Sequence, residues 1–329
     1  MLNSKIEKIP QILAGCKLKF YLYVFLLPAC MQMSARSLAQ FFQVKKNNGE
    51  IEVSENNHKI LFYQYLPKSS KSLNGQYERA GYIHPLYDLN GKIITEDFPE
   101  DHPYHHGIFW AWHQVIINDK KIADGWVYDN LFFQPHKINV KNNKKNVIIK
   151  SEMYWKSVFR NHNAEPILKE KTLIKIYAKQ KNYRVINFDI FLKPIVDNLK
   201  IGGSDDAKGY GGFCLRLKLP PDITFESDGQ TVLPQENAVL AGKWMNFTGS
   251  FGDEKRRSGI LIFNHSANPG QQNKWILRNS NSMQNVPYPG SIAVLLPKKG
   301  LRLQHIIIVH DGTMDNVQIR ELYAEYCDN

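Results

Sequence analysis

The chain has 329 residues, of which 43% are hydrophobic, and its 42 basic and 31 acidic side chains give a formal net charge of +11 when histidine is neutral. The sequence shows no basic-aromatic repeat and no motif of a nucleic-acid-binding fold, so we expect no nucleic-acid partner. The excess of basic residues then describes either a solvated surface or one that attracts an acidic substrate such as a uronate polymer.

The first forty residues have the pattern of an export signal. Lysines precede an apolar run at 20–30, and the small residues Ser37 and Ala39 follow it. A run of about eleven residues is too short to span roughly 30 Å of hydrocarbon as a helix. We therefore expect a signal peptide at 1–39, cleaved after Ala39, and an exported protein in the periplasm or outside the cell, with no stable membrane insertion. A lipoprotein signal acylated at Cys30 is the alternative, which the preceding Pro-Ala pair disfavours.

The mature chain would carry a net charge of +7, because five basic residues and one acidic residue leave with the signal. Its two cysteines, Cys214 and Cys327, lie far apart and without CxxC spacing. They form a disulfide in an oxidising compartment or stay free, and their number excludes a cysteine-ligated zinc site.

Nearly every apolar segment after residue 50 is typical of a β-strand, because it is rich in Ile, Val, Tyr and Phe and often alternates with polar residues. The predicted strands are 59–66, 146–155, 171–179, 183–192, 259–263, 291–297 and 303–310. Turn-like runs at 141–146 and 179–182 predict hairpin tips. Helical spacing is confined to 314–326, with Asp315 as N-cap. The sequence predicts one domain, 40–329: an all-β, large antiparallel β-sandwich with a short C-terminal helix.

The stretch DFPEDHPYHHGIFWAWHQV, at 97–115, concentrates histidine beside an acidic residue. Asp101, His102, His105 and His106 lie within six positions, and His84 lies upstream. Imidazole suits proton transfer at neutral pH and also binds metals. The spacing matches no known metal motif, so we predict no cofactor and no metal ligands. A transition metal at His102, His105 and His106 is one alternative, and purely structural histidines are the other.

Alternation along the strand that follows places His106, Ile108, Trp110 and Trp112 on one face. Indole faces and imidazoles suit a sugar ring, which has apolar CH groups and polar hydroxyls. We therefore assign Trp110 and Trp112 to substrate binding. The alternative is a core strand whose tryptophans fill volume.

Two further groups of polar residues follow apolar strands late in the chain. Asn264, His265 and Asn268 end one strand, and His310 with Asp311 ends the last long one. Polar residues at such strand ends are typical of sites on a sheet rim, although an Asp-Gly pair is also an ordinary turn.

One arginine lies inside an apolar strand. Arg216 is surrounded by Phe213, Leu215 and Leu217, so its guanidinium must either meet an anion or face solvent. We assign it to substrate binding. The sequence shows no paired-carboxylate spacing of a glycosidase, no nucleophile elbow and no phosphate loop.

Four motifs carry a resemblance to a known family. They are HPLYDLNGKIITEDFPEDHPYHHGIFWAW from residue 84, GGFCLRLKLP from 211, NHSANPG followed by KWILRN from 264, and VHDG near the end. Together they resemble secreted bacterial proteins labelled "methane oxygenase PmoA", common in polysaccharide degraders. The family pattern is close to DHPHHRG, where this chain has Tyr104 for a histidine and His106 for the arginine.

The resemblance implies a supersandwich fold like that of galactose mutarotase and several polysaccharide-active enzymes. The membrane enzyme subunit that gave the label its name does not match, because the mature chain lacks an apolar run of the roughly 20 residues that a membrane helix requires.

Three functions follow from these observations. The first is a carbohydrate-active enzyme, a hydrolase, lyase or epimerase acting on an oligosaccharide or polysaccharide fragment; the second is a non-catalytic glycan-binding protein; the third is a metal-dependent oxygenase. For the first, which we favour, the catalytic candidates are His84, His102, His105, His106, His310 and Asp311. The substrate-binding candidates are Asp101, Trp110, Trp112, Arg216, Asn264, His265 and Asn268.

Overall fold

The computed structural model describes residues 41–328 except 74, 159–163, 252–255 and 281–282. The expected signal at 1–39 lies outside the described residues. Among those residues, no helix is long and apolar enough to cross a membrane.

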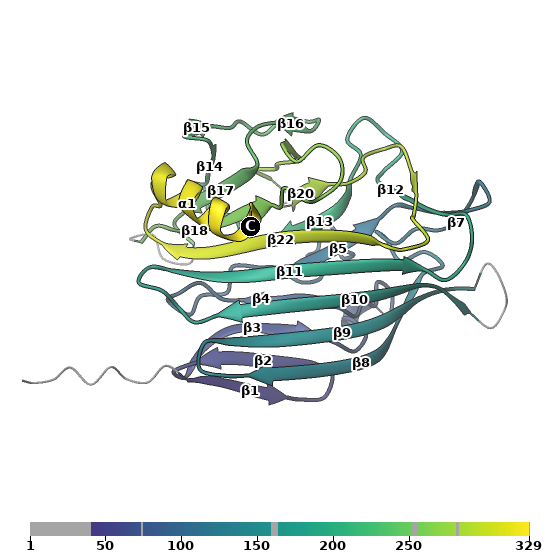
Figure 1. Ribbon diagram of the computed structural model, residues 1–329, viewed down its shortest axis with the longest axis horizontal. Coiled ribbons are helices and arrows are strands. Elements are labelled where there is room, and N and C mark those ends of the chain that lie inside the picture. The colour runs from purple at the N-terminus through teal and green to yellow at the C-terminus, as the bar shows by residue number, and fades with distance from the viewer. Residues whose placement is uncertain (1–40, 74, 159–163, 252–255, 281–282, 329) are drawn as a thin grey trace, which may run out of the picture. The chain divides into compact units, whose positions relative to one another are not determined.

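Two large antiparallel sheets contain most of the strands (Figure 1). In spatial order, the seven-stranded sheet consists of β1 (Phe42–Lys46), β2 (Glu50–Glu55), β3 (His58–Gln64), β4 (Tyr82–Leu86), β5 (Ile108–Trp112), β13 (Gly211–Arg216) and β20 (Met283–Pro287). The nine-stranded sheet consists of β15 (Gln230–Thr231), β14 (Thr224–Ser227), β17 (Trp244–Gly249), β18 (Ser258–Asn264), β22 (Leu301–Asp311), β11 (Tyr183–Pro194), β10 (Glu165–Tyr177), β9 (Asn146–Ser157) and β8 (Phe132–Asn142).

Two small sheets and two helical elements complete the described part. The small sheets are β21 (Val294–Leu295), β12 (Leu199–Gly202), β6 (Gln114–Ile117) and β7 (Lys120–Ala123), and the pair β16 (Val239–Leu240) and β19 (Lys274–Trp275). The helical elements are a 3₁₀ turn, Lys71–Leu73, and the helix α1, Asn316–Cys327. The side chain of Asp315 caps α1 by accepting a 2.8 Å hydrogen bond from the Gln318 amide, as predicted.

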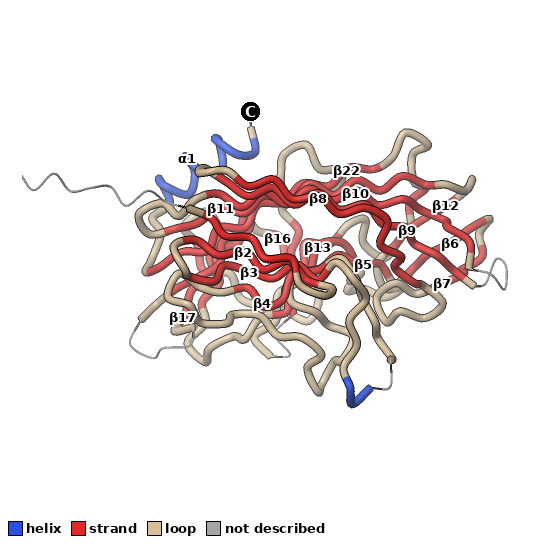
Figure 2. Tube along the Cα trace, turned by 90° about the horizontal axis from the view of Figure 1, so that it is seen from below, coloured by secondary structure: helices blue, strands red, loops and turns tan. Residues whose placement is uncertain are grey.

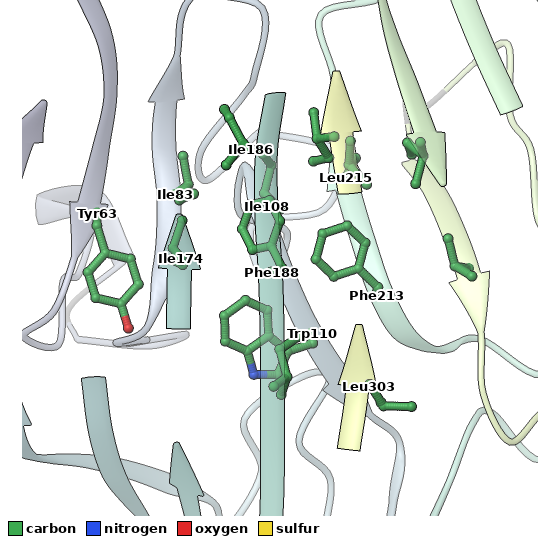
Figure 3. Packing of buried hydrophobic residues seen from close by; sticks show 14 of the residues in the cluster. Tyr63, Ile83, Ile108, Trp110, Ile174, Ile186, Phe188, Phe213, Leu215 and Leu303 are labelled. Carbon is green, nitrogen blue, oxygen red and sulfur yellow. The ribbon is translucent and has the colours of Figure 1, made fainter. Parts of the chain in front are cut away.

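The main core lies between the two large sheets, which Figure 2 shows as two layers of strands. Alternate residues of β9 and β10 are buried, as a sheet with one covered face requires. From the other layer, Ile108 and Trp110 of β5 and Phe213 of β13 pack into the same core (Figure 3). The predicted all-β sandwich with a short C-terminal helix is confirmed.

Local predictions were right for most strands and wrong at a few positions. Segment 291–297 forms only the two-residue strand β21, and Val317 of α1 is exposed rather than part of its apolar face. Cys214 and Cys327 are both free and buried, so they form no disulfide with each other.

The strands β5 and β13 also have a second face, turned away from the main core. Phe109 and Ala111 of β5 and Cys214 of β13 form a smaller cluster there with Tyr82, Trp126 and Met283. The loop that carries the early histidines lies next to this smaller cluster.

Candidate functional site

The histidine loop connects β4 to β5 and is held against the end of β13. The Arg216 amide donates to the Gly107 carbonyl at 2.7 Å, and the Glu96 amide donates to the Arg216 carbonyl at 3.1 Å. Within the loop, the His105 amide donates to the His102 carbonyl at 2.9 Å, which closes a tight turn. These backbone bonds fix the loop side chains relative to Arg216.

Arg216 lies at the centre of the site and is only 4% exposed. Its Nε donates to Glu96 Oε2 at 2.7 Å, and its Nη2 donates to Asp101 Oδ1 at 2.7 Å. Of the two possibilities that the sequence offered, the guanidinium meets anions and does not face solvent. Two carboxylates balance its charge, so Arg216 positions its neighbours.

Asp101 links this arginine to His102. Its second oxygen, Oδ2, lies 2.9 Å from His102 Nδ1. Partial burial opposes ionisation, but hydrogen bonds from His102 and Arg216 hold the pKa of the Asp101 carboxyl below its ordinary value. An ionised Asp101 accepts a proton-bearing Nδ1, which leaves Nε2 of His102 as the ring nitrogen available for proton transfer.

His105 lies parallel to His102, with ring centroids 4.8 Å apart and planes 4° apart. Burial, with smaller contributions from the neighbouring positive groups His102 and Arg216, lowers the pKa of His105 to about 2. A neutral His105 therefore accepts from Arg216 Nη1, 3.4 Å from its Nδ1. Its Nε2 must then carry the proton, so His105 is a fixed hydrogen-bond donor.

These two histidines line a pocket with a volume of about 260 Å³. Its aromatic residues are Tyr104, Trp126 and Tyr210, of which Trp126 is buried. The Trp126 ring stacks on His113, with centroids 5.0 Å apart, and meets His105 edge-on at 5.8 Å. The pocket thus joins two partly exposed phenol rings to imidazoles.

The remaining polar lining of the pocket is basic. Lys208 and Arg278 face it, and Met283 completes the wall. Residues Trp126, Tyr210 and Arg278 were missed by the sequence reasoning. Arg278 belongs to the KWILRN motif at 274–279. A single arginine in a motif does not indicate a pocket whose lining comes from segments more than 150 positions apart.

His84 lies in β4, and His106 lies at the end of the loop, just before β5. His106 is fully buried, with Nδ1 2.7 Å from Asp97 Oδ1, and its Nε2 has no partner among the described residues. Burial lowers the pKa of His106 and lowers that of His84 to about 4, and His84 Nδ1 lies 3.0 Å from Thr95 Oγ1. The prediction that His106 contacts substrate is wrong, because no part of the residue is exposed. It supports the loop from inside.

The assignment of Trp110 and Trp112 to substrate binding is also wrong. They are 1% and 0% exposed and belong to the main core between the sheets. The alternation was predicted correctly, but the face that carries the two tryptophans is the buried one. Neither ring offers a surface to a sugar.

The late residues do not join the pocket. Asn268 bonds to Asn264 at 2.7 Å, and His265 accepts from the Ala267 amide at 3.0 Å. His310 is buried between Asn246, 2.9 Å away, and the Gly312 carbonyl, 3.0 Å away.

The two late groups are also separate from each other. Gly259 pairs with His310 and Asn264 with His305, so the groups lie at opposite ends of β18, roughly 17 Å apart along the strand. Asp311 accepts a 3.4 Å bond from Asn90 near one of those ends. Their predicted catalytic and binding roles are therefore not supported.

The described geometry also bears on the metal alternative at His102, His105 and His106. Across the residues that the structure describes, no three His, Cys, Asp or Glu side chains form a group that could hold a metal ion. The lone pairs of an imidazole lie in its ring plane, so the parallel rings of His102 and His105 do not point to a common atom. The His106 ring is fully buried, with Nδ1 bonded to Asp97.

Residues 50–324 match the model of a family of unknown function, DUF6807, and the chain belongs to that family. No curated protein matches the chain.

Proposed function

We propose that the protein is a carbohydrate-active enzyme, in which His102, oriented by Asp101, transfers a proton to or from an oligosaccharide in the pocket. The observation that carries this proposal is the chain of hydrogen bonds from Arg216 through Asp101 to His102. A carboxylate held by arginine fixes both the tautomer and the direction of the imidazole, which is the arrangement of a general base.

The pocket suits a sugar in its other contacts. Tyr104 and Tyr210 are partly exposed pocket residues whose rings can pack against the CH groups of a pyranose. His105, neutral at physiological pH, offers an Nε2–H donor to a hydroxyl or ring oxygen. Hydrolysis, β-elimination and epimerisation all require proton transfer of this kind.

Two further expectations from the sequence support the same proposal. The resemblance to PmoA-labelled and galactose-mutarotase-like proteins connects the sandwich with sugar chemistry, although fold alone does not give a reaction. The export signal expected at 1–39 would deliver the protein to the periplasm or the extracellular space, where oligosaccharides from polysaccharide degradation occur.

The test is a product-release assay over a panel of neutral and acidic oligosaccharides. Wild type should convert at least one of them, and His102→Ala should lower turnover by about 10²- to 10⁴-fold, the usual contribution of a general acid or base. The matched control, His265→Ala, changes a partly buried histidine of the late group and should turn over normally. Circular dichroism should show both variants folded. Turnover by His102→Ala at the wild-type rate would refute the proposed role.

A further inference from the structure

The pocket is lined by basic side chains and by no carboxylate of the described residues. Its ionisable lining residues are His102, His105, His113, Lys208, Arg278 and two tyrosines, with no carboxylate among them. The nearby acids Asp101 and Asp124 are bound to Arg216 and His102, and to His113 and Lys121, respectively. The lining therefore carries positive charge and no carboxylate of its own, and Glu236 beside Lys208 offsets part of that charge.

Arg278 is held in place without a negative partner. Its Nη1 donates to the carbonyls of Gln235 and Leu277 at 2.6 and 2.7 Å, and its Nη2 donates to the Glu236 carbonyl at 2.6 Å. Among the described residues, no carboxylate forms an ion pair with it. The guanidinium lies over the Tyr210 ring, 5.3 Å from the centroid.

The backbone of Arg278 is equally fixed. The Arg278 amide donates to Gln284 Oε1 at 3.0 Å, and Gln284 Nε2 donates to the Arg278 carbonyl at 2.7 Å. Gln284 is fully buried, so it is a rigid support. An arginine fixed at both ends binds an anion at a low cost in conformational entropy.

Lys208 adds a second, looser cation. Its Nζ lies 3.9 Å from Glu236 Oε1, and that carboxylate side chain is 84% exposed. An exposed pair at this distance contributes little, so an incoming anion can compete with Glu236. Asp206, which accepts from the Lys208 amide at 3.0 Å, is the other acid beside it.

We infer that Arg278, assisted by Lys208, binds an anionic ring substituent of the sugar, a carboxylate or a sulfate. The inference rests on the proposed sugar site and specifies its substrate class: an acidic saccharide. Three of the five N–H groups of Arg278 bond to carbonyls, which leaves Nε–H and one Nη2–H for the oxygens of either group, and the same sugar packs beside Tyr210. Arg216, whose charge two carboxylates balance, does not have this role.

The test measures binding by isothermal titration calorimetry with three probes: a uronic acid trisaccharide, its carboxyl-reduced neutral counterpart, and that counterpart carrying sulfate. Wild type should bind an anionic probe more tightly than the neutral one. Arg278→Gln should weaken the affinity for the anionic probe by roughly 10- to 100-fold, as expected for the loss of charge-assisted hydrogen bonds. Lys208→Gln should weaken the same affinity by a smaller factor. The control Lys298→Gln neutralises a lysine that is 92% exposed and should change nothing. The anionic probe that binds tighter identifies carboxylate or sulfate.

Three outcomes would overturn the inference. Equal affinity for neutral and anionic probes would remove it and leave the sugar site standing. An unchanged affinity of Arg278→Gln for the anionic probes would do the same. Failure of all three probes to bind wild type would remove both the inference and the proposed function.

Discussion

The two regions of this protein that look alike in sequence differ in what their polar atoms contact. In the loop before β5, Asp101 bonds to His102 and to Arg216 of β13, and the His102 side chain remains 30% exposed. At the end of β18, Asn268 donates to the Gln304 carbonyl and accepts from the Gln304 amide, both at 2.6 Å. The first region leaves the His102 side chain partly exposed at the pocket, whereas the second uses its polar atoms to bond a loop to the backbone of β22.

Residue type alone therefore does not identify a functional site. Histidine and asparagine at a strand end satisfy buried backbone groups as readily as they bind a ligand. What separates the two regions is the charge of the partners and an atom left for a ligand.

The largest effect should come from His102. His102→Gln removes the base but keeps a polar side chain, so turnover should fall by about 10²- to 10⁴-fold. Because the His102 side chain is partly exposed, the free energy of unfolding should change by less than about 1 kcal/mol. Steady-state kinetics and urea unfolding measure the two quantities. A large loss of stability with unchanged turnover would show that His102 has a structural role and not a catalytic one.

Two aromatic residues, Trp110 of the main core and Tyr210 of the pocket wall, should differ in their effect on stability. Trp110→Ala leaves a void in the main core, and we expect it to cost about 3–5 kcal/mol of unfolding free energy. Tyr210→Ala, at the partly exposed wall of the pocket, should cost far less and weaken sugar binding instead. Thermal unfolding and calorimetric titration of both variants check this. Normal stability of Trp110→Ala together with lost sugar binding would restore the role that the sequence suggested.

Acid should destabilise the protein through its buried histidines. Burial lowers the folded-state pKa of His310 to about 4 and that of His305 to about 3, below the ordinary 6.5. Between these values and pH 6.5 the unfolded state binds more protons than the folded state. The contribution of the two neutral histidines to the free energy of unfolding is therefore complete above pH 6.5 and is lost as the pH falls towards the folded-state pKa. For His310 the loss is roughly 3 kcal/mol at about 1.4 kcal/mol per pKa unit.

Urea unfolding across this pH range, for wild type and His310→Gln, measures that loss. The variant removes one titrating group, so its stability should depend less steeply on pH. Equal slopes for the two proteins would show that His310 does not titrate as described.

The smallest effect should come from Asn268. Asn268→Ala removes the acceptor of the Gln304 amide and one of two donors to the Gln304 carbonyl, which also accepts from the His265 amide at 3.3 Å. We expect the loss to cost about 1–3 kcal/mol of unfolding free energy. Turnover on any substrate that wild type converts should stay within about twofold of wild type, because Asn268 does not line the pocket. A specific loss of activity in a fully stable variant would return the late group to the site.

The sequence predicts the fold because strand periodicity is a local signal. Alternation in segments 146–155 and 171–179 is sufficient to place β9 and β10, and the Asp315 cap follows from local chemistry alone. His102 and His105 were likewise found from their density in one loop.

The rest of the site depends on long-range packing. Which face of β5 is buried is decided by the opposing sheet, so Trp110 and Trp112 were assigned to the wrong environment. Arg278 reaches the pocket through bonds to Gln235 and Glu236, more than 40 positions away. Such pairings leave no trace in the local pattern of one sequence.

The most direct test of the account is a titration followed by NMR on protein labelled at histidine, with a uronic acid trisaccharide as the ligand. The account predicts that the ring signals of His102, His105 and His113 shift with added sugar, while those of His265, His305 and His310 stay in place. Substitution of each histidine in turn would assign the signals. Shifts confined to the late histidines, or no shift at any histidine, would contradict the central claim that the pocket beside Asp101 and His102 is the functional site.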